Sequence, residues 1–510
     1  MTDINRRQFI GTSAAALAAA STGGIAMSQP SKRPNILFMM GDQHRGDTIG
    51  ADGHPCVQTP HLDRIANEGV LFSAAYSSTP SCTPARAGIL SGLKPWNHGQ
   101  LGYGRVADAY PHEFPTMLNE SGYHTRCIGK NHFHPQRHPH GYGDVFVDES
   151  GRAESDVFVS DYRQWFATVA PDRNPDETGI GWNDHRAKAY ALPEELHPTR
   201  WTGNEAVRFI DEHEGDEPWL LKVSFARPHS PYDPPARLMD MYADADIPPA
   251  AIGDWAEQNA MRGAKHDNSL ARGDLGPNQP IVSRQGYYGS VTFIDEQIGR
   301  IVAALEARGD LDNTLIVYTA DHGDMLGDHH LWRKTYGYQG SARIPMLVRW
   351  PTTLAPDAER GRTLPNPVEL RDLAPTFLHA GGAEYDPEWF DGRSMIEAIN
   401  GASDWREFID LEHSRCYWKE NQWTGLTDGR WKYLYYAPTG RQELFDMESD
   451  PCECRNLADD PAHAADTKLW RQRMVDELAE RGEPFVIDGD LGIREPAMLW
   501  SPNYPKKQEA

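Results

Sequence analysis

Six cysteines are too few for a disulfide scaffold to carry the stability of a chain of 510 residues. Basic residues are also in deficit, because 50 lysines and arginines face 74 aspartates and glutamates and leave a net charge of −24. No segment beyond residue 30 approaches the roughly 20 apolar residues of a membrane span. We therefore expect no nucleic-acid partner, no integral membrane segment in the mature protein, and a stability that depends on an apolar core.

The first 30 residues differ from the rest of the chain. Arg6 and Arg7 are adjacent, Phe9 follows them, and the stretch GTSAAALAAASTGGIA is weakly apolar and rich in small residues. This combination resembles a twin-arginine export signal. We expect the protein to be exported to the periplasm or the extracellular space, and we exclude residues 1–30 from the fold.

Four short apolar runs predict buried strands at Asn35–Met40, Thr125–Ile128, Trp219–Phe225 and Thr314–Thr319. The runs are continuous rather than alternating, which is typical of parallel strands that are covered on both faces. Helical patterns lie between them, most clearly over Asn204–His213 and Tyr288–Arg308. Strands that alternate with helices indicate an α/β fold with a large, mostly parallel sheet sandwiched by helices.

The pattern changes near residue 400. Short antiparallel strands are predicted within Trp423–Tyr436 and Arg441–Met447, and a closing helix is predicted over Ala464–Arg481. We expect a catalytic α/β domain over residues 31–400. A smaller α+β domain with an antiparallel sheet, followed by a tail, is expected over residues 401–510.

Residues with polar or charged side chains follow each of the four predicted strands. In chain order they are Asp42, Gln43 and His44, then Lys130 and His132, then Arg227 and His229, and last Asp321 and His322. Ligands bind at the carboxyl ends of strands in sheets of this kind, so one shared site is predicted there. Since the whole chain is acidic, an anionic substrate requires such a local group of cations.

Cys82 begins the pentapeptide Cys-Thr-Pro-Ala-Arg, which ends at Arg86. Thr83 suits an N-cap and Pro84 suits the first position of a helix, so Cys82 is predicted beside a helix N-terminus. Free backbone N–H groups and a partial positive charge at that end stabilise an anion. Arg86 lies one turn further on, on the same side.

The pentapeptide resembles the C-x-P-x-R signature of the type I sulfatases, the formylglycine-dependent branch of the alkaline phosphatase superfamily. Further segments resemble this family in the expected order, namely RPNILFMMGDQ, GYHTRCIGKNHF, ARPHSPYDPP, TADHGDMLGDHHLWRK and GLTDGRWKYLYY. The resemblance implies an alkaline-phosphatase-like fold. It also implies an arylsulfatase or glycan-sulfatase activity that releases sulfate from an organic ester, with a sulfated carbohydrate as the expected substrate.

The resemblance further implies a modified nucleophile and a metal. Cys82 would be oxidised to formylglycine by a formylglycine-generating maturase, and the aldehyde hydrate would attack sulfur. One divalent metal would be bound by the modified Cys82 and by four residues, Asp42, Gln43, Asp321 and His322. Ca²⁺ suits the oxygen ligands. His322 stands where many family members have asparagine, and its imidazole admits Mn²⁺ or another transition metal.

The remaining roles that the resemblance implies concern charge and protons. Arg86, Lys130 and Lys334 would hold the nucleophile and the sulfate oxygens. His229 would protonate the leaving oxygen, and His132 would take the proton whose loss expels sulfate. Six further residues, in histidine-rich segments or just beyond the signature helix, are predicted to contact substrate: Asn97, His98, His134, Arg137, His185 and Arg186.

Three alternatives remain open at this point. Phosphonate or phosphate ester hydrolases of the same superfamily share the formylglycine and an Asp-Gln, Asp-His metal set. The segment GKNH favours sulfate, because the Lys–His pair in it is missing from those phosphonate hydrolases. A choline-sulfatase-like activity also fits the metal residues. The alternative of another class is an unmatured protein that only binds sulfated glycans, and the completeness of the site argues against it.

Overall fold

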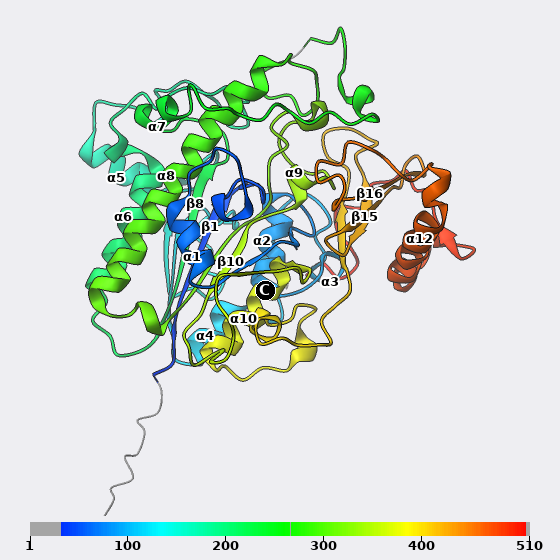
Figure 1. Cartoon of the computed structure of the whole chain (residues 1–510). Helices are drawn as coiled ribbons and strands as arrows, with labels where there is room; N and C mark the ends of the chain where they lie inside the picture. Colours follow the sequence, from blue (N-terminus) through cyan, green and yellow to red (C-terminus); the bar gives the residue numbers. More distant parts are fainter. Residues whose placement is uncertain (1–31, 266, 506–510) are drawn as a thin grey trace, which may run out of the picture. The chain divides into compact units, whose positions relative to one another are not determined.

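The computed structural model describes residues 32–265 and 267–505 (Figure 1). The segment interpreted as an export signal, residues 1–30, lies outside the described residues. Among the described residues, no helix has both the length and the apolar character needed to cross a bilayer.

An eight-stranded sheet has the strand order β11-β2-β10-β9-β1-β8-β4-β5. Its centre is β1 (Asn35–Asp42), which pairs in parallel with β9 (Thr314–Ala320) on one side and with β8 (Trp219–Pro228) on the other. Beyond β8 lie β4 (His124–Gly129) and β5 (Asp144–Val147), also parallel. The four predicted strands are confirmed, and each extends slightly beyond its predicted run.

The other half of the sheet is mixed. β10 (Met346–Arg349) is antiparallel to both β9 and β2 (Val70–Phe72), and β11 (Arg362–Leu364) is parallel to β2. The sheet is therefore mostly parallel with one reversed strand, in agreement with the expected fold class.

Helices cover both faces of this sheet (Figure 1). Alternate residues of β1 show the two faces, because Phe38 packs on one side and Leu37 on the other, both fully buried. The first face is covered by α2 (Cys82–Ser91), α4 (Phe114–Glu120), α10 (Leu373–Gly381) and α11 (Met395–Ile399). The second is covered by α1 (Pro60–Asn67), α5 (Asp161–Val169), α6 (Pro198–Glu212) and α8 (Asn278–Arg308). Burial on both faces explains why the strands are continuous apolar runs.

Two helix starts differ from the predictions. The N-cap of α2 is Ser81 and the helix begins at Cys82, so the expectation that Thr83 caps it was wrong. Thr83 Oγ1 is instead bound from outside the helix, accepting hydrogen bonds from Gln100 Nε2 at 2.9 Å and from the Gly104 N–H at 3.1 Å. Helix α8 begins at Asn278, well before Tyr288, because Pro280 falls in its first turn, where proline is tolerated.

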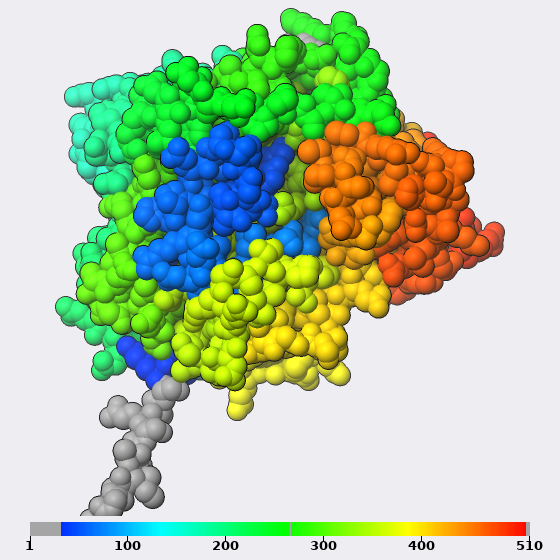
Figure 2. Space-filling view, in the orientation of Figure 1, coloured from blue at the N-terminus to red at the C-terminus, as the bar shows by residue number. Residues whose placement is uncertain are grey.

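A second, four-stranded antiparallel sheet follows, formed by β13 (Ile409–His413), β14 (Trp423–Thr427), β15 (Trp431–Tyr436) and β16 (Arg441–Asp446). The predicted segment Trp423–Tyr436 is thus a hairpin of two strands, and β13 was not predicted. Helix α12 (Ala464–Leu478) closes this part of the chain, as expected. Figure 2 shows the surfaces coloured green and orange next to each other. Trp255 Nε1 donates a hydrogen bond to the Glu453 carbonyl at 2.9 Å.

The C-terminal tail packs on the loop that follows the signature helix. The Leu101 N–H donates to the Leu499 carbonyl at 3.0 Å, and the Ser501 N–H donates to the Gly99 carbonyl at 2.8 Å. Gly104 lies so close to Trp500 that a Cβ there would be 2.3 Å from the indole ring. The position of residues 99–104 therefore depends on the tail.

Asp295 generates a prediction about stability and pH. From α8 it accepts hydrogen bonds from the backbone N–H groups of His61 at 3.1 Å and Leu62 at 2.7 Å, and so caps α1. Burial raises the pKa of Asp295 to about 7. The folded state therefore holds a proton that the unfolded state releases near pH 4, so this contribution to stability is present at low pH and is lost as the pH rises through about 7.

Asp295→Asn keeps an acceptor oxygen and carries no charge. We expect its melting temperature to equal that of the wild type at about pH 5 and to exceed it at about pH 8. Glu212→Gln, an exposed acid at the end of α6, is the control. A difference that stays constant between the two pH values would contradict the assignment.

Candidate active site

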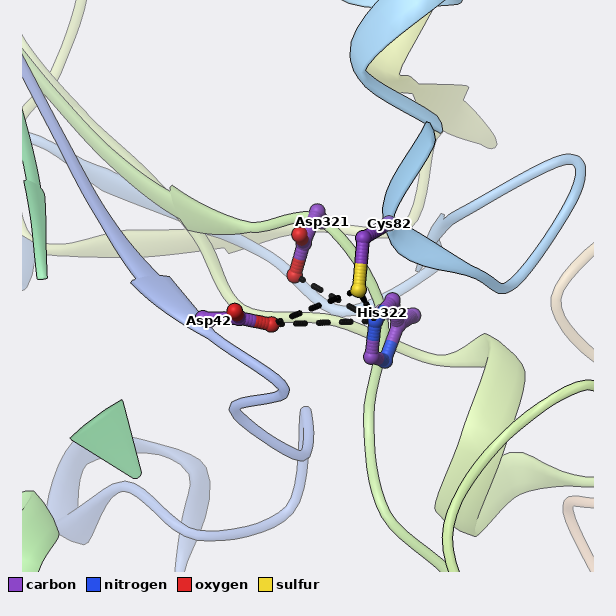
Figure 3. A group of neighbouring side chains, drawn as sticks. All are labelled: Asp42, Cys82, Asp321 and His322. Carbon is purple, nitrogen blue, oxygen red and sulfur yellow. Dashed lines mark hydrogen bonds and ion pairs between the residues drawn. The ribbon is translucent and has the colours of Figure 1, made fainter. Parts of the chain in front are cut away.

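Four buried side chains meet at the carboxyl edge of the large sheet: Asp42, Cys82, Asp321 and His322 (Figure 3). Asp42 ends β1, Asp321 and His322 follow β9, and Cys82 is the first residue of α2. Cys82 Sγ lies 3.2 Å from His322 Nε2 and 3.8 Å from Asp42 Oδ1. One potential ligand atom from each of the four residues lies within 4.8 Å of the others.

The chemistry of this group fits a divalent cation. His322 Nδ1 donates to the Gly323 carbonyl at 2.9 Å, which leaves Nε2 facing Asp42 Oδ1 and Asp321 Oδ1, each 3.7 Å away. Burial lowers the pKa of His322, but the charges of Asp321 and Cys82 outweigh burial and raise it above the ordinary value. The position in front of Nε2 thus favours positive charge, and two carboxylates with an imidazole are suitable ligands for a metal.

Gln43 reaches the same region from a left-handed backbone conformation, with φ of 68°. Its N–H donates to Asp321 Oδ1 at 3.0 Å, and its Oε1 accepts from Lys334 Nζ at 2.8 Å. Its Nε2 donates to Asp324, a buried acid that the sequence analysis did not single out. Gln43 is therefore held between Asp321, Asp324 and Lys334, with its amide oxygen on the lysine.

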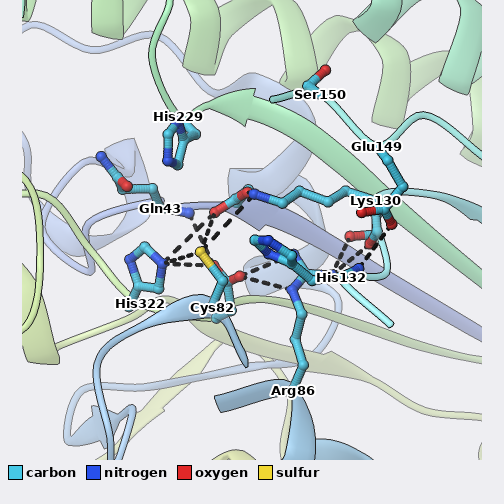
Figure 4. Close-up of polar contacts among 12 residues, drawn as sticks. Gln43, Cys82, Arg86, Lys130, His132, Glu149, Ser150, His229 and His322 are labelled. Atoms are coloured by element: carbon cyan, nitrogen blue, oxygen red, sulfur yellow. Dashed lines mark hydrogen bonds and ion pairs between the residues drawn. The ribbon is translucent and has the colours of Figure 1, made fainter. Parts of the chain in front are cut away.

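Two buried cations neutralise the carboxylates. Arg86 Nε donates to Asp321 Oδ2 at 2.9 Å, and Lys130 Nζ forms an ion pair with Asp42 and lies 4.0 Å from Cys82 Sγ. Burial has the largest effect on the Cys82 thiol and raises its pKa, as does Asp42. Lys130, Lys334 and His322 together outweigh them, so the pKa is below its ordinary value. The site thus stabilises an anion at the position of Cys82 (Figure 4).

His229 and Lys334 form a hydrogen-bonded pair. His229 Nδ1 donates to the Ser230 carbonyl at 2.8 Å, so Nε2 accepts from Lys334 Nζ at 2.8 Å. Burial, followed by the charges of Lys334 and Lys130, holds the pKa of His229 well below its ordinary value. Trp182 stacks on the imidazole with ring centroids 3.8 Å apart. No pattern in the sequence distinguishes Trp182 from the other tryptophans.

His132 is held from behind by Glu149 (Figure 4). Glu149 Oε1 accepts the backbone N–H groups of Asn131 at 2.7 Å and His132 at 2.8 Å, and His132 has a left-handed φ of 60°. Burial and the charge of Lys130 place the pKa of His132 well below its ordinary value. Glu149 was missed because β5, the strand that it follows, was not predicted.

A pocket of about 250 Å³ opens over Cys82 and is also lined by His132 and Lys334. Its other walls come from loops that are far apart in the sequence, and they include Tyr103, Arg152, Trp182, Asn183, Arg333 and Tyr417. None of these six residues follows a predicted strand. No pattern in the sequence therefore marked them as site residues.

The structure places two of the predicted substrate contacts in α3 (Pro95–His98), the short helix that follows α2. Asn97 Nδ2 donates to both carboxylate oxygens of Asp391, at 3.0 and 2.9 Å. His98 is buried, and burial followed by the charge of Arg371 lowers its pKa to about 3. Neither residue is among those that line the pocket over Cys82.

The other four predicted contacts lie in loops away from this pocket. Arg137 forms an ion pair with Asp161 at 2.6 Å, and Arg186 pairs with Asp184. His134 is exposed, whereas His185 is buried with its ring against Trp332, the centroids 5.1 Å apart.

Comparison with known proteins agrees with this geometry. Residues 34–383 match the profile of the sulfatase family. The chain belongs to that family. Residues 327–480 of this sulfatase match the profile described as N-sulphoglucosamine sulphohydrolase, C-terminal.

Relatives of this sulfatase extend over nearly the whole chain. It is 35% identical over 472 residues to the arylsulfatase of Clostridium perfringens, covering 90% of this chain and 97% of that protein. It is 30% identical to the choline-sulfatase of Rhizobium meliloti, covering 85% and 84%. The solved structure of the phosphonate monoester hydrolase of Agrobacterium radiobacter has a TM-score of 0.72 at 25% identity, covering 91% and 100%. The protein is a sulfate ester hydrolase with an alkaline-phosphatase-like fold.

The position of Glu149 predicts an effect on turnover. Glu149→Ala removes the acceptor that holds the backbone of His132, so we expect kcat for an aryl sulfate to fall by roughly tenfold to a hundredfold. Glu149→Gln keeps an acceptor oxygen and should retain most of the activity. Asp156→Asn, an exposed acid on the same stretch of chain, is the control. Equal losses in the alanine and glutamine variants would show that the charge of Glu149, and not its hydrogen bonds, matters.

Proposed function

We propose that this sulfatase removes sulfate from a sulfated carbohydrate by means of a formylglycine made from Cys82. The observation that carries the proposal is the place of Cys82, at the start of α2 and on the floor of the pocket, with Sγ next to His322 and Asp42. The match of residues 327–480 to a family named for an N-sulphoglucosamine sulphohydrolase supports a sugar substrate.

Two groups would complete the site. Asp42, Asp321 and His322, with Gln43 and the modified Cys82, would hold one divalent cation, Ca²⁺ in our proposal, with Mn²⁺ as the alternative that the imidazole admits. A bound cation would neutralise charge on the nucleophile and on the sulfate oxygens. Conversion of Cys82 by a formylglycine-generating maturase would supply a geminal diol, with one hydroxyl to attack and a second to allow elimination.

The chain's own cations would bind the sulfate group. Lys334 lines the pocket, Lys130 Nζ lies behind it at 4.0 Å from Cys82 Sγ, and Arg86 holds Asp321 through a hydrogen bond from Nε. Fixed donors of this kind stabilise the charge that spreads over the transferring group without having to reorganise during the reaction.

The histidines would divide the proton transfers. Because Lys334 Nζ donates to His229 Nε2, we infer that the two residues share the proton that passes to the leaving alcohol oxygen. His132 also lines the pocket and has a low pKa, so it is a neutral base that could accept the proton released when sulfate is expelled.

The wider organisation of the protein is part of the same proposal. Residues 1–30 would direct export to the periplasm or the extracellular space. Residues 31–400 would form the catalytic domain, and residues 401–510 a smaller domain whose first strand, β13, begins at Ile409.

The residues that line the pocket bear on two other candidate substrates. Choline sulfate carries a quaternary ammonium group, and the guanidinium groups of Arg152 and Arg333 on the pocket wall would repel it. A phosphonate monoester is the stronger second candidate, because a phosphonate monoester hydrolase shares the fold over nearly the full chain. The presence of both Lys130 and His132 is our reason to prefer sulfate.

The test of the reaction is a ratio of two activities. Matured enzyme is expected to cleave an aryl sulfate far faster than a phenyl phosphonate, as judged by kcat/KM. Cys82→Ala should abolish both, and mass spectrometry of the Cys82 peptide should find the aldehyde in the active wild type. A higher rate with the phosphonate would move the protein to the phosphonate branch, and an unmodified thiol in active enzyme would refute the proposed nucleophile.

Removal of the metal gives a separate prediction. Chelation with EDTA should lower kcat by at least roughly a hundredfold, since the buried carboxylates then lack their cation. Ca²⁺ should restore activity, and Mn²⁺ should restore less. The same titration followed by thermal unfolding should show stabilisation by Ca²⁺ in the wild type and none in Asp321→Ala. Better recovery with Mn²⁺ would assign the site to a transition metal.

A further inference from the structure

A second cavity adjoins the pocket over Cys82. Its volume is about 430 Å³, and it shares Ser150, Gly151 and Trp182 with that pocket. Figure 4 shows Ser150 on the far side of Lys130 and Glu149 from Cys82. None of the residues assigned above to the metal or to the sulfate group lines this cavity. A ligand in it would therefore be bound through a part other than its sulfate group.

Arg227 lines the cavity and is only 5% exposed. Its Nε and one terminal nitrogen donate to Asp233, at 2.7 and 3.1 Å. The other terminal nitrogen is buried and has no hydrogen-bond partner among the described residues. A guanidinium is always charged, and a buried donor without an acceptor is unfavourable, so this position favours a ligand that brings one.

Arg163 repeats the pattern at the same cavity. One of its terminal nitrogens pairs with Asp176 at 2.6 Å, while its Nε is buried without a partner among the described residues. Asp148 offers a hydrogen-bond acceptor, where the two arginines offer donors. It is 1% exposed, and its carboxylate accepts from Ser150 Oγ at 3.2 Å, which leaves room for further donors.

The charges of the side chains that line the second cavity indicate which kind of ligand it suits. Two arginines line the cavity together with three acids, Asp148, Glu154 and Asp176. This excess of acid disfavours a second sulfate or a carboxylate. Donors and acceptors side by side, between the rings of Tyr162 and Trp182, suit a neutral group that carries several hydroxyls.

We propose that this cavity is a subsite for a second, uncharged sugar residue of the substrate. Arg227 and Arg163 donate to its hydroxyls, and Asp148 accepts from them. Trp182, which stacks on His229, is the wall shared by the two cavities, so the second sugar lies next to the residue that we assign to the leaving oxygen. This inference rests on the proposed function and narrows the substrate to a disaccharide or longer.

The test compares substrates of different length. Wild-type enzyme is assayed with 4-nitrophenyl sulfate, with the sulfated monosaccharide that it cleaves best, and with that unit linked to a neutral hexose. We expect kcat/KM for the disaccharide to exceed that for the monosaccharide by about tenfold or more. Arg163→Met should reduce this preference to about twofold or less, mainly through KM.

Two further variants make the result decisive. Ala153→Phe narrows the cavity without removing a charge and should also reduce the preference, while Arg173→Met, an exposed arginine paired with Glu177 outside the cavity, should not. Thermal unfolding confirms that each variant folds. An unchanged preference in both cavity variants, or a preference for a disaccharide that carries a second sulfate, would overturn the subsite while turnover of 4-nitrophenyl sulfate leaves the proposed function standing. Failure of the wild type with every sulfate ester would instead overturn the proposed function.

Discussion

The arrangement of the candidate active site depends on two buried carboxylates, Asp42 and Asp321, which determine the side chains that can surround them. Both are fully buried, and an ionised group in that position is stable only with charged or hydrogen-bonding partners. Arg86 and Lys130 provide these partners, yet each cation touches one carboxylate from one side. The other oxygen atoms of the two carboxylates lie close to His322 and Cys82. The raised pKa of His322 indicates that positive charge is still favoured at this position. A group of side chains that could hold a metal and a position that stabilises an anion thus arise from the same two acids.

The register of the sheet brings these groups together. Gly41 pairs with Ala320, so the next residues on the two strands, Asp42 and Asp321, are neighbours at the sheet edge. Gly129 pairs with Ser224 on β8, which places Lys130 at the same edge. Because parallel strands all end on one side, four short loops deliver acids and cations to a single point without any long connection.

This logic explains how much could be predicted from the sequence. Continuous apolar runs mark buried strands, and the residues after Met40 and Thr319 are therefore recognisable before register is known. Trp182 and Tyr417 could not be recognised in this way, since they lie on loops that only tertiary packing brings to the pocket. The same limit applies to Asn97, whose partner Asp391 is nearly 300 positions away in the chain. Local capping rules likewise favoured Thr83 over Ser81, because the bonds from Gln100 and Gly104 are not local.

The residues at the sheet edge and the residues on the loops have different roles in the proposed function. The first would carry out the reaction, and the second would select the substrate. The group around Cys82 is set by strand ends, and in our proposal it would bind only the anionic part of the ester, which sulfate and phosphonate esters have in common. If the substrate is a sulfated sugar, as we propose, the contacts that distinguish one sugar from another would therefore come from the loops. Trp182 connects the two functions, since it lines both cavities and also stacks on His229. A sugar that displaced this indole would also move the imidazole of His229. Binding of the sugar away from sulfur would then change the position of the group that we assign to the leaving oxygen.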